Sequence, residues 1–191
     1  MNSNRPIEIY SARTIGTFFL LAFLAYGFGR NFFERDSDSE KYLGAVLIIA
    51  NSVMVLWIGI LFRKTIQQYS DLVGNIYLFT RVFEAAALAS IVLSLIPFMS
   101  ISHDYGYFLA MLVLGLGSIP MCLTLYKHKV LPSWLAIWGA IGYAVFAFGF
   151  LMEFFDKKWS MYLLLPGGLW EITFAVYLLI KGGQNEKTTK L

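Results

Sequence analysis

Residues 42–62 read YLGAVLIIANSVMVLWIGILF, a stretch without a single charged side chain. A helix needs about 20 mostly apolar residues to cross the hydrocarbon core of a bilayer. This stretch has that length and composition, so it predicts a membrane-spanning helix. Five further stretches with few charges have similar lengths: residues 14–33, 76–98, 105–126, 131–155 and 161–180. The sequence therefore predicts an all-α fold, a bundle of six transmembrane helices.

The composition of the whole chain agrees with a membrane protein. Of its 191 residues, 58% are hydrophobic and 14% are charged, whereas soluble domains carry about a quarter charged residues. The connections between the apolar stretches are short, which favours antiparallel packing of consecutive helices in one bundle. We therefore expect residues 1–191 to form one transmembrane domain with short tails. Two arginines precede the first stretch, as in a signal peptide, but the later spans favour a helix that stays attached.

Lysine and arginine are unevenly distributed over the connections. Short cytoplasmic loops of membrane proteins are enriched in these residues. With the N-terminus inside, nine fall on the cytoplasmic side, namely Arg5, Arg13, Arg63, Lys64, Lys127, Lys129, Lys181, Lys187 and Lys190, and four on the other, namely Arg35, Lys41, Lys157 and Lys158. We therefore expect both termini to be cytoplasmic. Tyrosine and tryptophan fall near the expected interfaces, and we place Tyr77 at the cytoplasmic one.

The longest connection, RKTIQQYSDLVGN at residues 63–75, is not purely polar. Its apolar residues Ile66, Tyr69, Leu72 and Val73 have near-helical spacing. Two interpretations stay open: a short amphipathic helix in the cytoplasmic interface, or an irregular loop with a few apolar contacts.

Three charged residues lie away from the ends of the apolar stretches: Arg81, Glu84 and Glu171. A charge at the centre of a spanning helix costs about 3 kcal/mol, so such residues are paired or functional. Arg81 and Glu84 are spaced i,i+3 and share a helix face. Arginine offers five N–H donors, so we expect Glu171 to be its second partner. A rise of 1.5 Å per residue places Asn51 at a similar depth.

This group of polar residues has two interpretations. Two carboxylates around one guanidinium leave a net negative charge, which favours protonation of one carboxylate in an apolar environment. The first interpretation is therefore a site that holds a proton, a cation or a small-molecule ligand with a cationic group. The second is that the group only joins two helices and fixes the register of the bundle, as buried ion networks sometimes do.

Helix-breaking residues occur in two of the expected spans. Pro120 lies in the fourth span, and Pro166, Gly167 and Gly168 precede Glu171 in the sixth. Proline removes a backbone hydrogen bond, so each helix is expected to be kinked or broken. Interrupted helices near the middle of the membrane are typical of transporter binding sites. The alternative for each is a packing kink that neighbouring helices compensate.

The two halves of the chain also suggest a 3+3 inverted repeat. Three spans per half place the halves in opposite orientations across the membrane. Glu84 and Glu171 occupy corresponding positions, and each half has a proline in its last span, Pro97 and Pro166. We retain this repeat as a hypothesis.

Several kinds of chemistry lack the residues they need. The two histidines, His103 and His128, are expected on opposite sides of the membrane, and no H-E-x-x-H or other metal-spaced cluster occurs. No G-x-S-x-G motif is present either, so we assign no catalytic residue and expect no cofactor and no metal. The net charge of +3 follows the bias of the loops, and we expect the lipid bilayer and not nucleic acid as a partner. The oligomeric state stays open.

Four segments resemble a family of bacterial membrane proteins catalogued as domain of unknown function (DUF) 4386. They are SARTIGTFFLLAF at residues 11–23, FTRVFEAAALA at 79–89, YKHKVLPSWLAIWGAIGY at 126–143 and LLLPGGLWEITFAVYLLIKG at 163–182. The R-x-x-E of the family falls on Arg81 and Glu84, and its late proline and glutamate fall on Pro166 and Glu171. The resemblance implies six spans in a bacterial inner membrane and implies no activity.

Two functions follow from these residues. The first is a small transporter or permease-like protein with a proton- or ligand-binding Arg-Glu-Glu site. The second is a non-catalytic helical module that binds a lipid or protein partner, in which the charged residues are structural. An intramembrane enzyme is less well supported, because no nucleophile or metal set is visible. A cavity that reaches Glu84 or Glu171 would favour the transporter, and a fully packed group of charges would favour the module.

Overall fold

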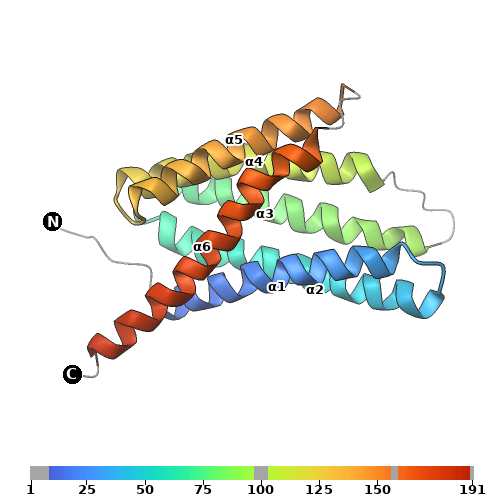
Figure 1. The fold of residues 1–191 in the computed structure, drawn as a ribbon, viewed down its shortest axis with the longest axis horizontal. Coiled ribbons are helices and arrows are strands. Elements are labelled where there is room, and N and C mark those ends of the chain that lie inside the picture. Colours follow the sequence, from blue (N-terminus) through green and yellow to red (C-terminus); the bar gives the residue numbers. More distant parts are fainter. Residues whose placement is uncertain (1–8, 97–102, 156–158, 190–191) are drawn as a thin grey trace.

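A computed structural model describes the backbone of residues 9–96, 103–155 and 159–189, and the side chains of residues 12–96, 106–155 and 159–181. The described chain is helical, without strands (Figure 1). The elements are α1 (Ile9–Phe33), α2 (Asp38–Ile66), α3 (Asp71–Ser90), the short 3₁₀ helix η1 (Ile91–Leu95), α4 (His103–Lys127), α5 (Ser133–Glu153) and α6 (Ser160–Thr189). Six helical segments are long and apolar enough to cross a membrane, η1 continuing the third, which confirms the predicted all-α fold of six spans.

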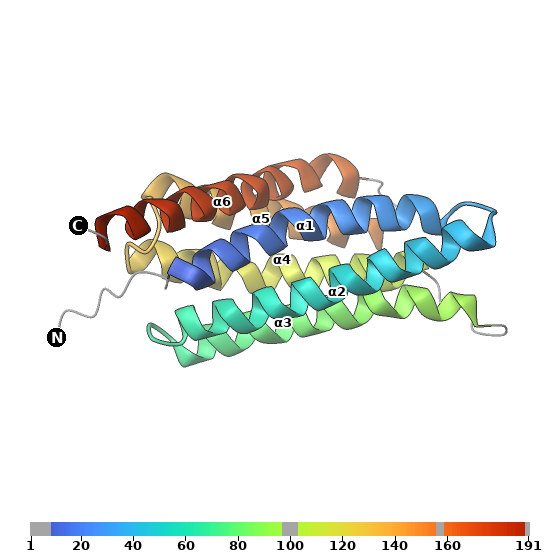
Figure 2. The same cartoon turned by 90° about the horizontal axis from the view of Figure 1, so that it is seen from below.

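The six helices form a closed ring in chain order. Each long helix packs against the next one in the chain, and α6 packs against α1 (Figures 1 and 2). α1 begins and α6 ends at the same end of the bundle, which we call the terminal end (Figure 1). The α2–α3 and α4–α5 connections lie at that end. The α1–α2 connection lies at the opposite end, which we call the far end, and α4 and α6 begin there. This up-and-down course gives the ring a central interior that all six helices can reach.

The outside of the ring is apolar as well as its interior. Val46, Val53, Phe79 and Ile141 are large apolar side chains that are exposed on the helices. A soluble monomer rarely exposes extended apolar surface, because that surface is costly in water. Lipid chains cover such a surface in a bilayer, so both faces of these helices fit a multi-pass membrane protein.

The connection between α2 and α3 differs from both sequence-based interpretations. α2 continues to Ile66 and α3 begins at Asp71, so only residues 67–70 separate the two helices. Ile66 is fully buried, which explains why α2 extends that far. The Ser70 hydroxyl accepts a hydrogen bond from the Val73 N–H at 3.3 Å and caps the start of α3. Ile66, Leu72 and Val73 therefore belong to the adjoining ends of two spanning helices, and Tyr69 lies in the short connection between them.

The expected helix breaks do not occur in the described residues. α4 runs without interruption through Pro120, and α6 runs through Pro166. The alternative of a helix divided into two segments is therefore wrong. Pro97, which the repeat hypothesis pairs with Pro166, lies outside the described residues. The backbone changes instead at the end of α3, where the helix tightens into η1 after Ser90.

Gly117, which lies just before Pro120 in α4, has a packing role. A Cβ atom at Gly117 would lie 2.0 Å from Cγ2 of Thr80, which is closer than any van der Waals contact allows. Only glycine lets α4 approach α3 this closely. Gly117, in the G-x-G sequence before Pro120, therefore allows the close contact between α3 and α4.

Aromatic rings fill the interior of the ring toward the terminal end. The group comprises Phe19, Phe62, Tyr77, Trp170 and Phe174, which we call the aromatic layer; each is buried. The ring centroids of Phe62 lie 5.3 Å from Tyr77 and 5.6 Å from Phe174. Trp170 stacks on Phe174 at 4.8 Å, and Phe19 meets Phe174 edge-on at 6.0 Å. Contacts of this kind add to the burial of apolar area and close the interior on this side.

Candidate functional site

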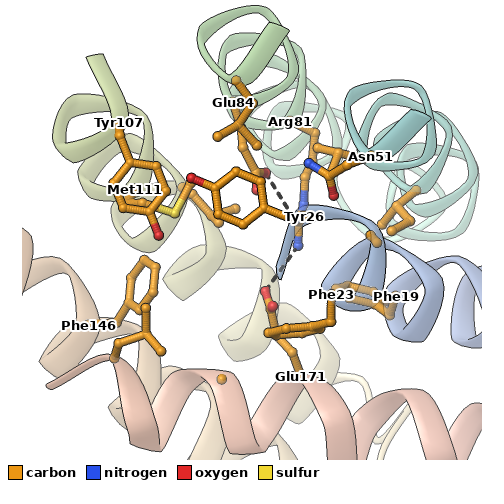
Figure 3. Close-up of a pocket in the computed structure, with 17 residues that line it drawn as sticks. Phe19, Phe23, Tyr26, Asn51, Arg81, Glu84, Tyr107, Met111, Phe146 and Glu171 are labelled. Atoms are coloured by element: carbon orange, nitrogen blue, oxygen red, sulfur yellow. Dashed lines mark hydrogen bonds and ion pairs between the residues drawn. The ribbon is translucent and has the colours of Figure 1, made fainter. Parts of the chain in front are cut away.

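Arg81 lies in the middle of α3 and points into the ring interior, where its side chain is 2% exposed. Its Nη1 donates to Oε2 of Glu84 at 2.9 Å, one turn along the same helix. Its Nη2 donates to Oε1 of Glu171 on α6 at 3.4 Å. The predicted contact of Arg81 with both carboxylates is therefore confirmed (Figure 3). The ion pairs join α3 to α6, two helices that are not neighbours in the ring.

Two tyrosines complete the arrangement, and the sequence did not predict either. Nε of Arg81 donates to the hydroxyl of Tyr77 at 2.9 Å. The hydroxyl of Tyr143 on α5 donates to Oε1 of Glu171 at 2.6 Å. We call Tyr77, Arg81, Glu84, Tyr143 and Glu171 the charged cluster.

Tyr77 is fully buried in the aromatic layer, so its side chain does not face the lipid headgroups as a residue of an aromatic belt would. Its i,i+4 spacing from Arg81 was a usable signal, since residues four apart on a helix share a face. Tyr143 gave a weaker signal, a hydroxyl in the middle of the apolar span of α5. Spacing in the chain does not reveal that α5 brings this hydroxyl to Glu171.

The surroundings of Arg81 fix the guanidinium group. Its central carbon lies 5.2 Å from the ring centroids of both Phe19 and Tyr77, within cation–π range. Gly59 on α2 packs directly on the side chain, since a Cβ atom there would lie 2.7 Å from Cβ of Arg81. Three N–H bonds and two aromatic rings therefore hold the guanidinium.

A cavity of about 110 Å³ adjoins the charged cluster. All six helices line it, with Phe19, Ala22, Phe23 and Tyr26 from α1, Asn51, Val55 and Ile58 from α2, Arg81, Glu84 and Leu88 from α3, Tyr107, Met111 and Leu114 from α4, Phe146 from α5, and Leu164, Gly168 and Glu171 from α6. Figure 3 shows the two carboxylates and Arg81 on one side of it, with aromatic rings facing them. Its lining residues on α4 and α6 belong to the first halves of those helices, which begin at the far end. The cavity thus extends from the charged cluster and from Phe19 of the aromatic layer toward the far end.

Asn51 lines the same cavity, beside Arg81 (Figure 3). The residue is 3% exposed, and its Nδ2 has no hydrogen-bond partner among the described residues. A buried polar group without a partner costs about 1–3 kcal/mol, so such groups are uncommon in native proteins. The amide therefore has a donor available for a group inside the cavity.

The carboxylates also have hydrogen-bonding capacity left. Oε2 of Glu84 and Oε1 of Glu171 accept the bonds described above, while the other oxygen of each accepts none from the described residues. A carboxylate offers about four acceptor positions, so each glutamate can bind a further donor. The cavity is therefore lined by free acceptors, by the free amide donor of Asn51 and by the hydroxyl of Tyr26, which also has no hydrogen-bond partner among the described residues.

Of the other residues singled out from the sequence, some lie at the cavity and others do not. Gly168 lines the cavity, and Gly167 packs against Phe146 with a Cβ position 3.3 Å away. Pro120 and Pro166 are not among the lining residues. No group of three His, Cys, Asp or Glu side chains that could hold a metal ion occurs in the described part of the chain.

Comparison with known families agrees with the resemblance seen in the sequence. The family described as Domain of unknown function (DUF4386) matches residues 98–182. This match covers α4, α5 and most of α6, and so includes Tyr143 and Glu171 of the charged cluster. The resemblance is confirmed over that part of the chain. No curated protein and no solved structure matches the chain.

Proposed function

We propose that this protein is a small transporter, permease-like in character, that binds a proton, a cation or a small ligand at the charged cluster. The observation that carries the proposal is the cavity of about 110 Å³ that reaches Arg81, Glu84 and Glu171. A share of about 30 Å³ per water molecule gives this cavity room for about four waters or a ligand of that size. Charges that served only to join helices would need no such space beside them.

The position of the cavity also supports transport. Alternating access requires a central site that is closed on one side at a time. The aromatic layer separates the charged cluster from the terminal end, while the cavity leads toward the far end. Glu84 on the third helix and Glu171 on the sixth both pair with Arg81 at the site, which suits the hypothesis of a 3+3 inverted repeat.

A second function has its own observation. Arg81 makes three hydrogen bonds and two cation–π contacts, so its charge is well compensated without any ligand. This fits a non-catalytic helical module that binds a lipid or protein partner, in which the cluster holds α3 against α6. The free carboxylate oxygens and the unpaired amide of Asn51 favour the transporter over this second function.

We further propose that the protein resides in a bacterial inner membrane with both termini in the cytoplasm. Basic residues of the described chain support this orientation. Arg63, Lys64, Lys127, Lys129 and Lys181 lie near the terminal end, and at the far end Arg35 is paired with Glu40. Such enrichment is typical of the cytoplasmic side.

Reconstitution into liposomes tests the transport proposal. Vesicles containing a pH-sensitive dye receive a pH gradient and, in turn, small cations, anions and neutral solutes. We expect the parent protein to move protons or one solute class in a pH-dependent way. Glu171→Gln, which keeps the shape and removes the charge, should abolish this activity while the protein stays folded. Glu40→Gln, an exposed carboxylate at the far end, is the matched control and should behave like the parent. Unchanged pH dependence in Glu171→Gln would favour the structural module.

A further inference from the structure

We infer that the cavity takes a small primary ammonium ion that carries one hydrogen-bond acceptor, such as the hydroxyl group of a short amino alcohol. This inference rests on the proposed function in that it uses the same cavity, and it adds the chemical class of the ligand. Four features of the cavity lead to it: its charge, its aromatic walls, its size and the unpaired amide of Asn51.

The charges of the cavity favour a cation. Two carboxylates and one guanidinium leave one net negative charge when all three are ionised. Three of the five N–H donors of the guanidinium are already bound to the two carboxylates and to Tyr77, and the two carboxylates outweigh its charge, so an anion gains little from it. The free oxygens of Glu84 and Glu171 would repel an anion and accept N–H bonds from an ammonium group.

The walls favour an organic cation over a metal ion. Phe23, Tyr26, Tyr107 and Phe146 line the cavity together with Phe19, whose ring already contacts Arg81, and aromatic ring faces attract cations. Figure 3 shows several of these rings grouped opposite the charged cluster. Hard metal ions need six or more oxygen ligands, or several retained waters, and aromatic walls supply neither. Methylene groups of an organic ligand, by contrast, would lie against apolar walls.

The size of the cavity favours a ligand of a few atoms. A dry protein cavity of about 150 Å³ is known to hold benzene, which has six carbon atoms. The smaller volume of about 110 Å³ therefore suits four or five non-hydrogen atoms. Ethanolammonium, with four, has this size and carries both an ammonium and a hydroxyl group.

Asn51 supplies the reason for the hydroxyl group. Its Nδ2 is buried in the cavity wall and has no hydrogen-bond partner among the described residues, so it bonds to neither carboxylate of the cluster. A hydroxyl oxygen on the ligand would accept from this amide, while the ammonium group binds the free oxygens of Glu84 and Glu171. A pure alkylammonium ion of equal size would leave the amide unpaired.

The test compares ethanolammonium with propylammonium, which has the same number of non-hydrogen atoms and lacks the hydroxyl. Binding to the full chain is measured by titration calorimetry in phosphatidylcholine nanodiscs, without any gradient. A ligand of four non-hydrogen atoms binds with a Kd no lower than about 40 μM, so millimolar concentrations are used. We expect ethanolammonium to bind about three- to tenfold more tightly than propylammonium, and acetate not to bind.

Two variants separate the roles of the side chains. Asn51→Leu should remove the preference for ethanolammonium while propylammonium binding stays unchanged. Glu171→Gln should weaken both amines by about tenfold or more. Ser52→Ala is the matched control, because the Ser52 hydroxyl bonds to the carbonyl of Ile48 in its own helix and does not line the cavity. Thermal unfolding checks that each variant is folded, and Asn51→Ala replaces Asn51→Leu if the larger side chain prevents folding.

The outcomes are distinguishable. No saturable amine binding, or equal binding of both amines with no effect of Asn51→Leu, overturns the inference. Solute-dependent proton flux without amine binding overturns it as well and leaves the transporter proposal intact. Amine binding without flux supports the inference and counts against transport. Weaker ethanolammonium binding in nanodiscs that contain phosphatidylethanolamine would assign the same ammonium chemistry to a lipid headgroup.

Discussion

Replacing Arg81 by methionine tests the energetic role of the charged cluster. Methionine fills much of the same volume but cannot donate the three hydrogen bonds of 2.9, 2.9 and 3.4 Å. Removal of one partner from a buried ion network costs about 3–5 kcal/mol, because the remaining charge has no compensation. For a chain of this length, about 2–4 °C of melting temperature corresponds to 1 kcal/mol. We therefore expect Arg81→Met to lower the melting temperature by about 6–20 °C.

The two carboxylates should not contribute equally to this loss. Glu84 has an almost fully buried side chain, 7% exposed, and Arg81 supplies its only hydrogen bond among the described residues. Glu171 is 13% exposed and keeps the hydrogen bond from Tyr143 when Arg81 is replaced. Glu84 is thus the more strongly stranded charge. Adding Glu84→Gln to Arg81→Met should restore more stability than adding Glu171→Gln.

The assay is thermal unfolding of purified protein in one detergent, followed by intrinsic fluorescence or circular dichroism. Arg30→Met is the control, since Arg30 forms a partly exposed pair with Glu34 at 2.7 Å, and exposed pairs contribute about 0–1 kcal/mol. The reasoning is refuted if Arg81→Met melts like Arg30→Met. It is also refuted if Glu171→Gln is the better second substitution.

Two further predictions concern helix packing and topology. Gly117→Ala should destabilise the protein by about 1–3 kcal/mol in the same unfolding assay, because the new methyl group would overlap Cγ2 of Thr80. Thr80→Ser removes that atom and keeps the hydroxyl, so it should restore most of the loss, and no restoration would contradict the contact. Cysteines introduced at Ser39 and Lys187 should be labelled from opposite sides of the membrane. The single native cysteine, Cys122, is buried and should not react with the label. Labelling of both from one side would contradict the six-span topology.

The sequence by itself determined the spans, because the requirement for about 20 apolar residues is local and can be read from composition. It also determined the contacts of Arg81. An arginine in the middle of a membrane must find acceptors, and few charged candidates exist in the apolar stretches. Glu84 followed from i,i+3 spacing and Glu171 from elimination. Both predictions needed only the physical cost of an unpaired charge.

The helix bounds and the effect of the prolines needed the tertiary structure. The sequence could not show that α2 continues to Ile66, because the packing of that residue in the core decides where the helix ends. Neighbouring helices let α6 continue through Pro166, although proline removes a backbone hydrogen bond.

Only the tertiary structure decided how the ring closes and what its centre contains. The packing of α5 against α6 brings the Tyr143 hydroxyl to Glu171, and the closed ring buries Tyr77. The cavity is the space that six sets of side chains leave between them, so no single stretch encodes it. For the same reason Asn51 could be placed at the right depth from its position in the chain, while its unpaired amide could be seen only with all its neighbours in place.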